Sequence, residues 1–140
     1  MNNQTDKIPK MFLCPITGEI ISDPWVVVTE NGGTCHSYEK EAIETWMKNH
    51  DTDPLTRHKR KSVGCNISLK HAIELYLNQL KVEELRNDPG LLSEVENWIR
   101  RRGGIEKLRE DSNMHNLVRN VEQVKESKSA DSSVELKHNE

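Results

Sequence analysis

The chain has 140 residues, of which 31% are charged and 34% are hydrophobic, and its formal net charge is -3. This length allows one ordinary domain with an extension, the low apolar fraction predicts a small core, and the charge gives no reason to expect nucleic acid or an anionic membrane as partner. No apolar run approaches the roughly 18 residues that span a bilayer, the N-terminus lacks the apolar segment of a secretory signal, and three widely spaced cysteines favour a reducing compartment, so we expect a soluble intracellular protein.

The first third of the sequence predicts a polar lead-in followed by loops and a β-hairpin. Residues 1–10 are expected to be flexible, and the prolines and glycine of residues 14–24 predict irregular loops. Residues 25–29 are β-branched and aromatic, which is typical of a strand. Asn31-Gly32 favours a type I′ turn, which needs two positive φ angles, and residues 34–36 are expected to return as the second strand.

Two helices separated by a loop are predicted next. Ser37 is the expected cap of a short helix that ends near residue 49. Ser68 is the expected cap of a second helix, whose apolar spacing predicts that it continues to Leu85. Residues 50–65 contain proline, glycine and a basic run, so we expect mostly loop with one short strand. The apolar stripe of the first helix comprises Ala42, Ile43, Trp46 and Met47.

A boundary follows at residues 87–90. Asp88 is expected to cap a new helix with Pro89 at its first position, and Gly103-Gly104 to end that helix. Apolar residues between 105 and 124 predict one or two more helices with a break at residues 112–113. Residues 127–140 are rich in Ser, Lys and Glu without periodicity and are expected to be disordered. The sequence therefore predicts a small α+β domain at residues 11–86 and a helical extension at residues 87–126.

The three cysteines make two functions worth considering, metal binding and catalysis by a thiol. Structural zinc sites normally use close pairs such as C-x₂-C, whereas only Cys35 has a potential ligand, His36, beside it. Free thiols are therefore favoured over a scattered zinc site built from Cys14, Cys35, Cys65 and a histidine. A catalytic Cys35–His36 pair is disfavoured because neighbouring strand residues point to opposite faces. The basic runs at residues 58–61 and 100–102 could contact phosphates, but without interleaved aromatics a solvated face is favoured.

Five short sequence motifs occur in an order along the chain that is more specific than any one of them. They are residues 12–20 (FLCPITGEI), 23–24 (DP), 36–43 (HSYEKEAI) with Trp46, 53–57 (DPLTR), and Asn66 with Leu69 and Ile73. Together they resemble a U-box, the zinc-free relative of the RING domain found in E3 ubiquitin ligases, over residues 12–77. The resemblance implies a RING-like fold without metal or other cofactor, in which a polar network takes the place of zinc. The side chains expected in that network are Asp23, Glu39, Asp53, Thr56 and Asn66.

The resemblance also implies an activity. It is that of a RING/U-box-type E3 ubiquitin transferase, which binds a ubiquitin-charged E2 enzyme and forms no covalent intermediate of its own. Arg57 matches the family's linchpin, an arginine that bridges E2 and ubiquitin, and its forked guanidinium suits such a bridge better than lysine would. The residues expected to bind the E2 are Pro15, Ile16, Trp46, Pro54 and Arg57.

Each of these residues also has a plainer interpretation. Ile16 and Trp46 could belong to the core, since large apolar side chains usually serve packing first. Pro54 could simply stiffen its loop. Arg57 could pair with Asp51 or Asp53 on the surface, where such pairs contribute about 0–1 kcal/mol.

The chain departs from the family pattern in two places, and we expect structural differences there. The segment from Trp25 to Cys35 is longer than the usual hairpin. After Arg57 a basic run replaces the usual apolar residue, the path to Asn66 is short, and Cys65 stands where proline is common.

Several expectations concern partners and location. Residues 87–126 match no family pattern and are expected to bind a protein substrate or partner, to form a homodimer, or to act as a cap that buries Leu80 and Leu85. A non-catalytic U-box-like scaffold is the alternative to the ligase. The expected location is the cytoplasm, or the host cytoplasm if the protein is an effector delivered by an intracellular bacterium.

Overall fold

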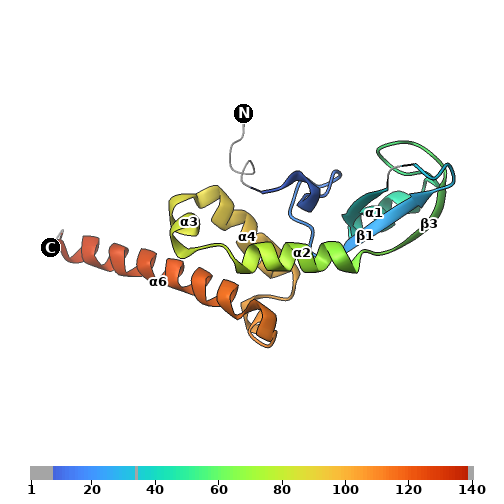
Figure 1. Ribbon diagram of the computed structural model, residues 1–140. Helices are drawn as coiled ribbons and strands as arrows, with labels where there is room; N and C mark the ends of the chain where they lie inside the picture. Colours follow the sequence, from blue (N-terminus) through green and yellow to red (C-terminus); the bar gives the residue numbers. More distant parts are fainter. Residues whose placement is uncertain (1–7, 34, 139–140) are drawn as a thin grey trace. The chain divides into compact units, whose positions relative to one another are not determined.

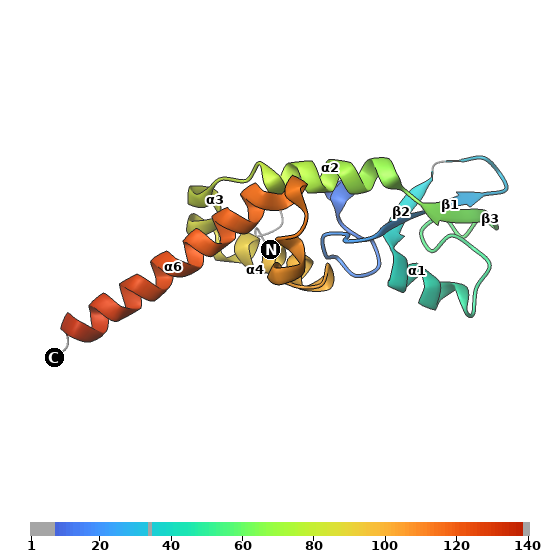
Figure 2. The same ribbon diagram turned by 90° about the horizontal axis from the view of Figure 1, so that it is seen from below.

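The computed structural model describes residues 8–33 and 35–138, with side chains up to residue 126. The chain forms two units, which in this described part are residues 8–73 and residues 74–138. Figure 1 labels their elements, with the first unit coloured blue to green and the second ending in red. Figure 2 shows the same elements after a turn of 90°.

The first unit is built on a three-stranded antiparallel sheet. Strands β1 (Pro24–Thr29), β2 (His36–Glu39) and β3 (Arg60–Cys65) lie in the order β2-β1-β3. The central strand places Val27 opposite His36 on one side and opposite Val63 on the other. The predicted strand at residues 25–29 and the short strand within residues 50–65 are confirmed, and so is the α+β class.

The β1–β2 hairpin is one place where the prediction is wrong. Of the return strand predicted at residues 34–36, His36 is the first residue of β2, and residue 34 lies outside the described residues. Gly32 has a positive φ of 70° while Asn31 does not, so the turn is not type I′. The Gly32 N–H instead donates to the Thr29 carbonyl at 3.2 Å. The Asn31 side chain explains this turn, because its Oδ1 accepts from Thr29 Oγ1 at 2.5 Å and from the Gly33 N–H at 3.1 Å.

The predicted caps of the first two helices, Ser37 and Ser68, are also wrong. Helix α1 (Lys40–Met47) begins after β2, since Ser37 is part of that strand and pairs with Val26. Helix α2 (Ile67–Asn78) is capped by Asn66, whose Oδ1 accepts from the Leu69 N–H at 3.1 Å. The Asn66 Nδ2 donates to Ser37 Oγ at 3.0 Å, so this one side chain caps a helix and ties it to the sheet.

The second unit is helical. Its elements after α2 are α3 (Val82–Asn87), α4 (Pro89–Arg101), α5 (Ile105–Leu108), the 3₁₀ turn η2 (Ser112–Met114) and α6 (His115–His138). The predicted continuation of α2 to Leu85 is wrong, because the chain turns at residues 79–81. Two bonds from α6 hold this turn: the Leu117 N–H donates to Asn78 Oδ1 at 2.9 Å, and Asn120 Nδ2 donates to the Leu80 carbonyl at 2.8 Å.

The ends of α4 agree with the sequence. Asp88 Oδ1 accepts from the Leu91 N–H at 3.1 Å, and Gly103 and Gly104 end the helix with φ angles of 108° and 96°. The break near residue 112 is confirmed by η2. The buried side chains of the unit include Leu80, Leu85, Leu91, Val95, Trp98, Leu108, Met114, Leu117, Val121 and Val124.

The predicted boundaries at the ends of the chain differ from the structure. Ile8 is buried and residues 10–12 form the 3₁₀ turn η1 (Lys10–Phe12), so the described part of the lead-in already belongs to the fold; residues 1–7 lie outside the described residues. The segment predicted as disordered continues α6 to His138, since elongating a formed helix costs far less than nucleating one; residues 139–140 lie outside the described residues. None of the described helices is long and apolar enough to cross a membrane.

Candidate functional site

Two loops of the first unit, residues 14–19 and 53–58, have matching backbone hydrogen bonds. In the first, the Cys14 N–H donates to the Glu19 carbonyl at 2.9 Å and the Cys14 carbonyl accepts from the Gly18 N–H at 2.7 Å. In the second, the Asp53 N–H donates to the His58 carbonyl at 2.9 Å and the Asp53 carbonyl accepts from the Arg57 N–H at 2.8 Å. The two proline-containing loops are therefore versions of one structure.

The side chains of the two loops match as well. The threonine hydroxyl accepts from the backbone N–H two residues later in both loops, from Glu19 to Thr17 and from His58 to Thr56, each at 3.2 Å. An isolated β-bridge closes the base of each loop. The repeated pattern Pro-Ile-Thr and Pro-Leu-Thr is the signal of this duplication, and sequence analysis overlooked it.

One position in the second loop carries backbone strain. The fifth loop residue has a left-handed conformation in both loops, with φ 75° at Gly18 and φ 67° at Arg57. Glycine adopts this conformation freely, whereas a residue with a Cβ costs roughly 1–2 kcal/mol. Among the described residues other than glycine, only Arg57 has a positive φ. Strain of this kind, held in place by its surroundings, is often found at functional sites.

The last two residues of β2 anchor both loops. The Tyr38 hydroxyl donates to Asp53 Oδ1 at 2.6 Å, and the Glu39 backbone N–H donates to Cys14 Sγ at 3.3 Å. Tyr38 and Cys14 are buried. The side chain of the first residue in each loop is thus fixed by the same end of one strand.

Glu39 also holds the segment that leads into β1. Its carboxylate accepts from the Ser22 N–H at 2.8 Å, from Ser22 Oγ at 2.9 Å and from the Asp23 N–H at 2.9 Å. The residue is 8% exposed. A buried carboxylate is stable only with such a full set of donors, and bonds to an ionised acceptor are the stronger kind.

Asp53 is the second buried carboxylate, at 1% exposure. Its Oδ2 accepts from the Thr56 N–H at 2.8 Å, while Oδ1 accepts from Tyr38. Burial by itself raises the pKa of Asp53, but the hydrogen bonds from Tyr38 and Thr56 outweigh it, and the net pKa lies below its ordinary value. Burial, followed by the bond to Asp53, raises the pKa of Tyr38.

The predicted polar network is therefore present in part. Glu39, Asp53 and Asn66 act through their side chains, Thr56 through its N–H and hydroxyl, and Asp23 through its backbone N–H. Ser22 and Tyr38 were missed, although each lies beside a residue that was predicted. Among the described residues, no three His, Cys, Asp or Glu side chains gather as a group that could hold a metal ion.

Two apolar side chains are exposed at the matching position of the two loops. Ile16 is 45% exposed and Leu55 is 51% exposed, so the interpretation of Ile16 as a core residue is wrong. Pro15 is exposed and Pro54 is half-buried. Leu55 was missed by sequence analysis, and its place after Pro54 in the repeated pattern would have identified it.

Trp46 on α1 is half-buried and is held in place from two sides. Its Nε1 donates to the Thr52 carbonyl at 2.7 Å, which ties the helix to the base of the second loop. The His50 ring stacks on the indole with 3.7 Å between ring centroids. Arg57 is exposed, and within the described residues its guanidinium forms no ion pair, so the predicted alternative of a pair with Asp51 or Asp53 is not what the structure shows.

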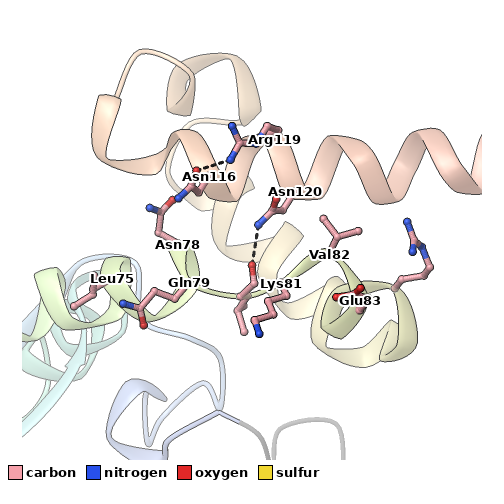
Figure 3. A pocket seen from close by; sticks show the side chains of 11 residues that line it. Leu75, Asn78, Gln79, Lys81, Val82, Glu83, Asn116, Arg119 and Asn120 are labelled. Atoms are coloured by element: carbon pink, nitrogen blue, oxygen red, sulfur yellow. Dashed lines mark hydrogen bonds between the residues drawn. The ribbon is translucent and has the colours of Figure 1, made fainter.

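A groove of about 600 Å³ lies in the second unit, between the α2–α3 connection and the start of α6 (Figure 3). Asn78 and Asn120 each use one end of the side-chain amide to join these segments. The other end of each amide has no partner among the described residues. The charged side chains that line the groove are Lys81, Glu83, Arg86 and Arg119, three cations against one carboxylate.

We predict that Tyr38→Phe destabilises the first unit by about 1–3 kcal/mol at pH 7, because it removes a donor from the buried Asp53 carboxylate. The pKa of Asp53 is lowered on folding, so its contribution is fully present above the unfolded-state pKa of about 3.9 and is lost as the pH falls through the folded-state pKa. The difference between wild type and variant should therefore shrink in that acidic range.

Urea unfolding at a series of pH values measures this difference. Asp51→Asn is the matched control, since it removes an exposed carboxylate of the same segment and should change stability by less than about 0.5 kcal/mol. A Tyr38→Phe variant as stable as wild type at pH 7 would show that the Tyr38–Asp53 bond does not hold the loop.

Comparison with known proteins identifies the family. The U-box domain family matches residues 8–82, more than half of the chain. U-box domain-containing protein 32 of Arabidopsis thaliana is 41% identical over 68 residues, 48% of this chain and 8% of its own length. The WD repeat, SAM and U-box domain-containing protein 1 of Homo sapiens is 42% identical over 73 residues, 50% of this chain and 14% of its own length.

A protein of Medicago truncatula, provisionally named E3 ubiquitin-protein ligase LIN, is 39% identical over 98 residues, 69% of this chain and 6% of its own length. This similarity is longer than the family match, so it continues beyond residue 82 into the helical unit. The chain spans only a small part of the length of each of these relatives. The family match over residues 8–82 and the architecture of the first unit agree, and the chain belongs to the U-box family.

Proposed function

We propose that this chain acts as an E3 ubiquitin ligase that binds a ubiquitin-charged E2 through the two matching loops and helix α1. The observation that carries the proposal is the loop pair itself, which exposes Ile16 and Leu55 at equivalent positions. The family match and a relative named as an E3 ubiquitin-protein ligase support the same activity.

The exposed apolar residues suit a small, transient interface. Ile16 and Leu55 each stand on a rigid loop closed by its own hydrogen bonds, so little conformational entropy is lost when they are covered. Trp46, oriented by Thr52 and His50, offers a partly exposed indole on the neighbouring helix. A few such anchors dominate the binding energy of most interfaces.

Arg57 is the residue proposed to promote transfer. Its guanidinium is uncommitted within the described chain and can donate to carbonyl groups of E2 and ubiquitin at once. This bridge would restrict the flexible E2–ubiquitin conjugate to conformations open to attack. The lysine amine of the substrate then attacks the thioester carbon, the C–N bond forms, the C–S bond breaks, and the E2 cysteine leaves as a thiol. The ligase itself forms no covalent bond.

We also propose that the helical unit recruits the protein substrate. Its groove presents uncommitted amide ends of Asn78 and Asn120, which suit hydrogen bonding to an extended peptide backbone. Three cations against one carboxylate favour an acidic segment of the substrate. The groove draws on α2 and the α2–α3 connection, so this recruiting surface would begin before residue 87.

The strain at Arg57 argues against the alternative of a non-catalytic scaffold. A scaffold would need the exposed apolar residues but has no use for an arginine in a left-handed conformation, where glycine would be more stable. A cytoplasmic location is part of the proposal, on the ground of the widely spaced cysteines. Homodimerisation and delivery as a bacterial effector stay predictions.

Autoubiquitination with a panel of E2 enzymes tests the proposal. We expect ubiquitin chains or multiple monoubiquitination with at least one E2 in the presence of E1, ubiquitin and ATP. Binding of an E2 without any transfer would favour the scaffold. Silence with every E2, both in binding and in transfer, would contradict the proposed function.

Truncating either loop anchor should weaken E2 binding with little effect on folding. We predict that Ile16→Ala and Leu55→Ala each weaken binding about tenfold, because each removes a contact at the centre of the interface. Calorimetry measures the affinity and thermal unfolding the stability. Met11→Ala is the control, since Met11 is 69% exposed outside both loops and should change neither quantity. A large loss of thermal stability for Ile16→Ala would indicate a packing role instead.

Replacing the strained arginine should separate stability from activity. We predict that Arg57→Gly raises the free energy of unfolding by about 1 kcal/mol, since glycine relieves the strain, while it slows ubiquitin discharge from E2 at least tenfold. Gly18→Ala is the mirror control: no atom obstructs the added Cβ, so only the φ of 75° should destabilise it. An Arg57→Gly variant with wild-type discharge would rule out the transfer role of Arg57.

The charge of the groove can be tested with a labelled peptide of alternating glutamate and glycine. We predict micromolar binding that weakens as salt is added, and about tenfold weaker binding by Arg119→Glu, because the reversal replaces attraction by repulsion. Lys107→Glu, an exposed cation outside the groove, is the control. Fluorescence anisotropy with equal affinities for wild type and Arg119→Glu would exclude this groove as an acidic-peptide site.

A further inference from the structure

The two residues that follow Arg57 are contacted from outside their own loop by the long β1–β2 hairpin. Asn31, in the hairpin turn, lies with its Nδ2 2.8 Å from Nδ1 of His58, the residue after Arg57. The Glu30 N–H donates to the Lys59 carbonyl at 2.9 Å. Two adjacent residues of the turn thus contact the two residues that follow the arginine.

The orientation of the Asn31 amide is fixed by its other partners. The Gly33 backbone N–H can only donate, so the Asn31 atom 3.1 Å from it must be the oxygen Oδ1. The Thr29 hydroxyl donates to the same oxygen. With Oδ1 so placed, the Asn31 NH₂ group faces His58 and its hydrogen-bond partner is Nδ1 of the ring.

These bonds determine the path of the backbone immediately after Arg57. The His58 N–H donates to Thr56 Oγ1, and the His58 carbonyl accepts from Asp53. These two bonds have equivalents in the first loop, whereas the bond from Asn31 to the His58 ring belongs to the second loop. The loop that contains a strained arginine, in place of glycine, is thus the one with an added restraint.

We propose that Asn31 is a positioning residue for ubiquitin transfer, acting through His58 to hold Arg57 in its left-handed conformation. The inference rests on the proposed function of Arg57. Without this restraint the strained φ can relax toward the favoured negative region, and the guanidinium then points away from its binding direction.

Single-turnover discharge of an E2–ubiquitin conjugate to free lysine, with E2 affinity measured separately, tests the inference. Asn31→Ala and His58→Ala should each slow discharge about fivefold, the size expected from loss of one exposed hydrogen bond, with E2 affinity unchanged. His58→Asn keeps an acceptor at the position of Nδ1 and should restore most of the rate. Glu30→Ala, which alters an exposed side chain in the same turn but keeps its backbone N–H, should match wild type.

A double-mutant cycle distinguishes positioning from a general loss of structure. In an Arg57→Ala background, Asn31→Ala should cause no further loss of discharge, because its effect passes through Arg57. Additive losses, or equal discharge by wild type, Asn31→Ala and His58→Ala, would overturn the inference while leaving the ligase intact. Absence of discharge by the wild type would instead overturn the proposed function. Should Asn31→Ala fail to fold, the comparison of His58→Ala with His58→Asn decides.

Discussion

The end of strand β2 is the point on which the first unit depends. Tyr38 and Glu39 leave the strand in opposite directions, and each fixes the first residue of one loop, Asp53 and Cys14. The two buried carboxylates, of Glu39 and Asp53, are stable there because each accepts several hydrogen bonds. A network of this kind is cooperative, and removing one member leaves a buried group unsatisfied. Closure of both loops therefore follows from a single short segment.

The closure of the loops determines which of their side chains are exposed. A loop closed by its own hydrogen bonds can keep Ile16 or Leu55 exposed, where a flexible loop would turn the side chain inward. The duplication also shows what differs between the loops. In the first loop the left-handed position is occupied by Gly18, which adopts this conformation without strain. In the second loop it is occupied by Arg57, which is strained, and Asn31 of the hairpin contacts the next residue, His58. The shared geometry exposes the two apolar residues proposed to bind the E2, and the difference between the loops exposes the arginine proposed to promote transfer.

Sequence alone predicted the parts whose cause is local. The strand at β1 follows from β-branched residues, and the α4 cap follows from Asp88 before Pro89. The failures have tertiary causes. Asn66 caps α2 in place of Ser68 because the same side chain also reaches Ser37, and the turn at residues 79–81 depends on bonds from α6. Leu55 was missed because Pro-Ile-Thr and Pro-Leu-Thr are short patterns, and only the matching backbone hydrogen bonds show that the two loops are equivalent.

Closure of both loops by hydrogen bonds, without a metal ion, is tested most directly by amide hydrogen exchange at Gly18 and Arg57. The exchange is monitored by NMR in the presence of a strong metal chelator. These two N–H groups close the loops through bonds to Cys14 and Asp53. We expect both N–H groups to exchange slowly, and Tyr38→Phe to increase the exchange rate at Arg57 more than at Gly18. Exchange as fast as in an unstructured chain, with protection restored by added zinc, would contradict this expectation.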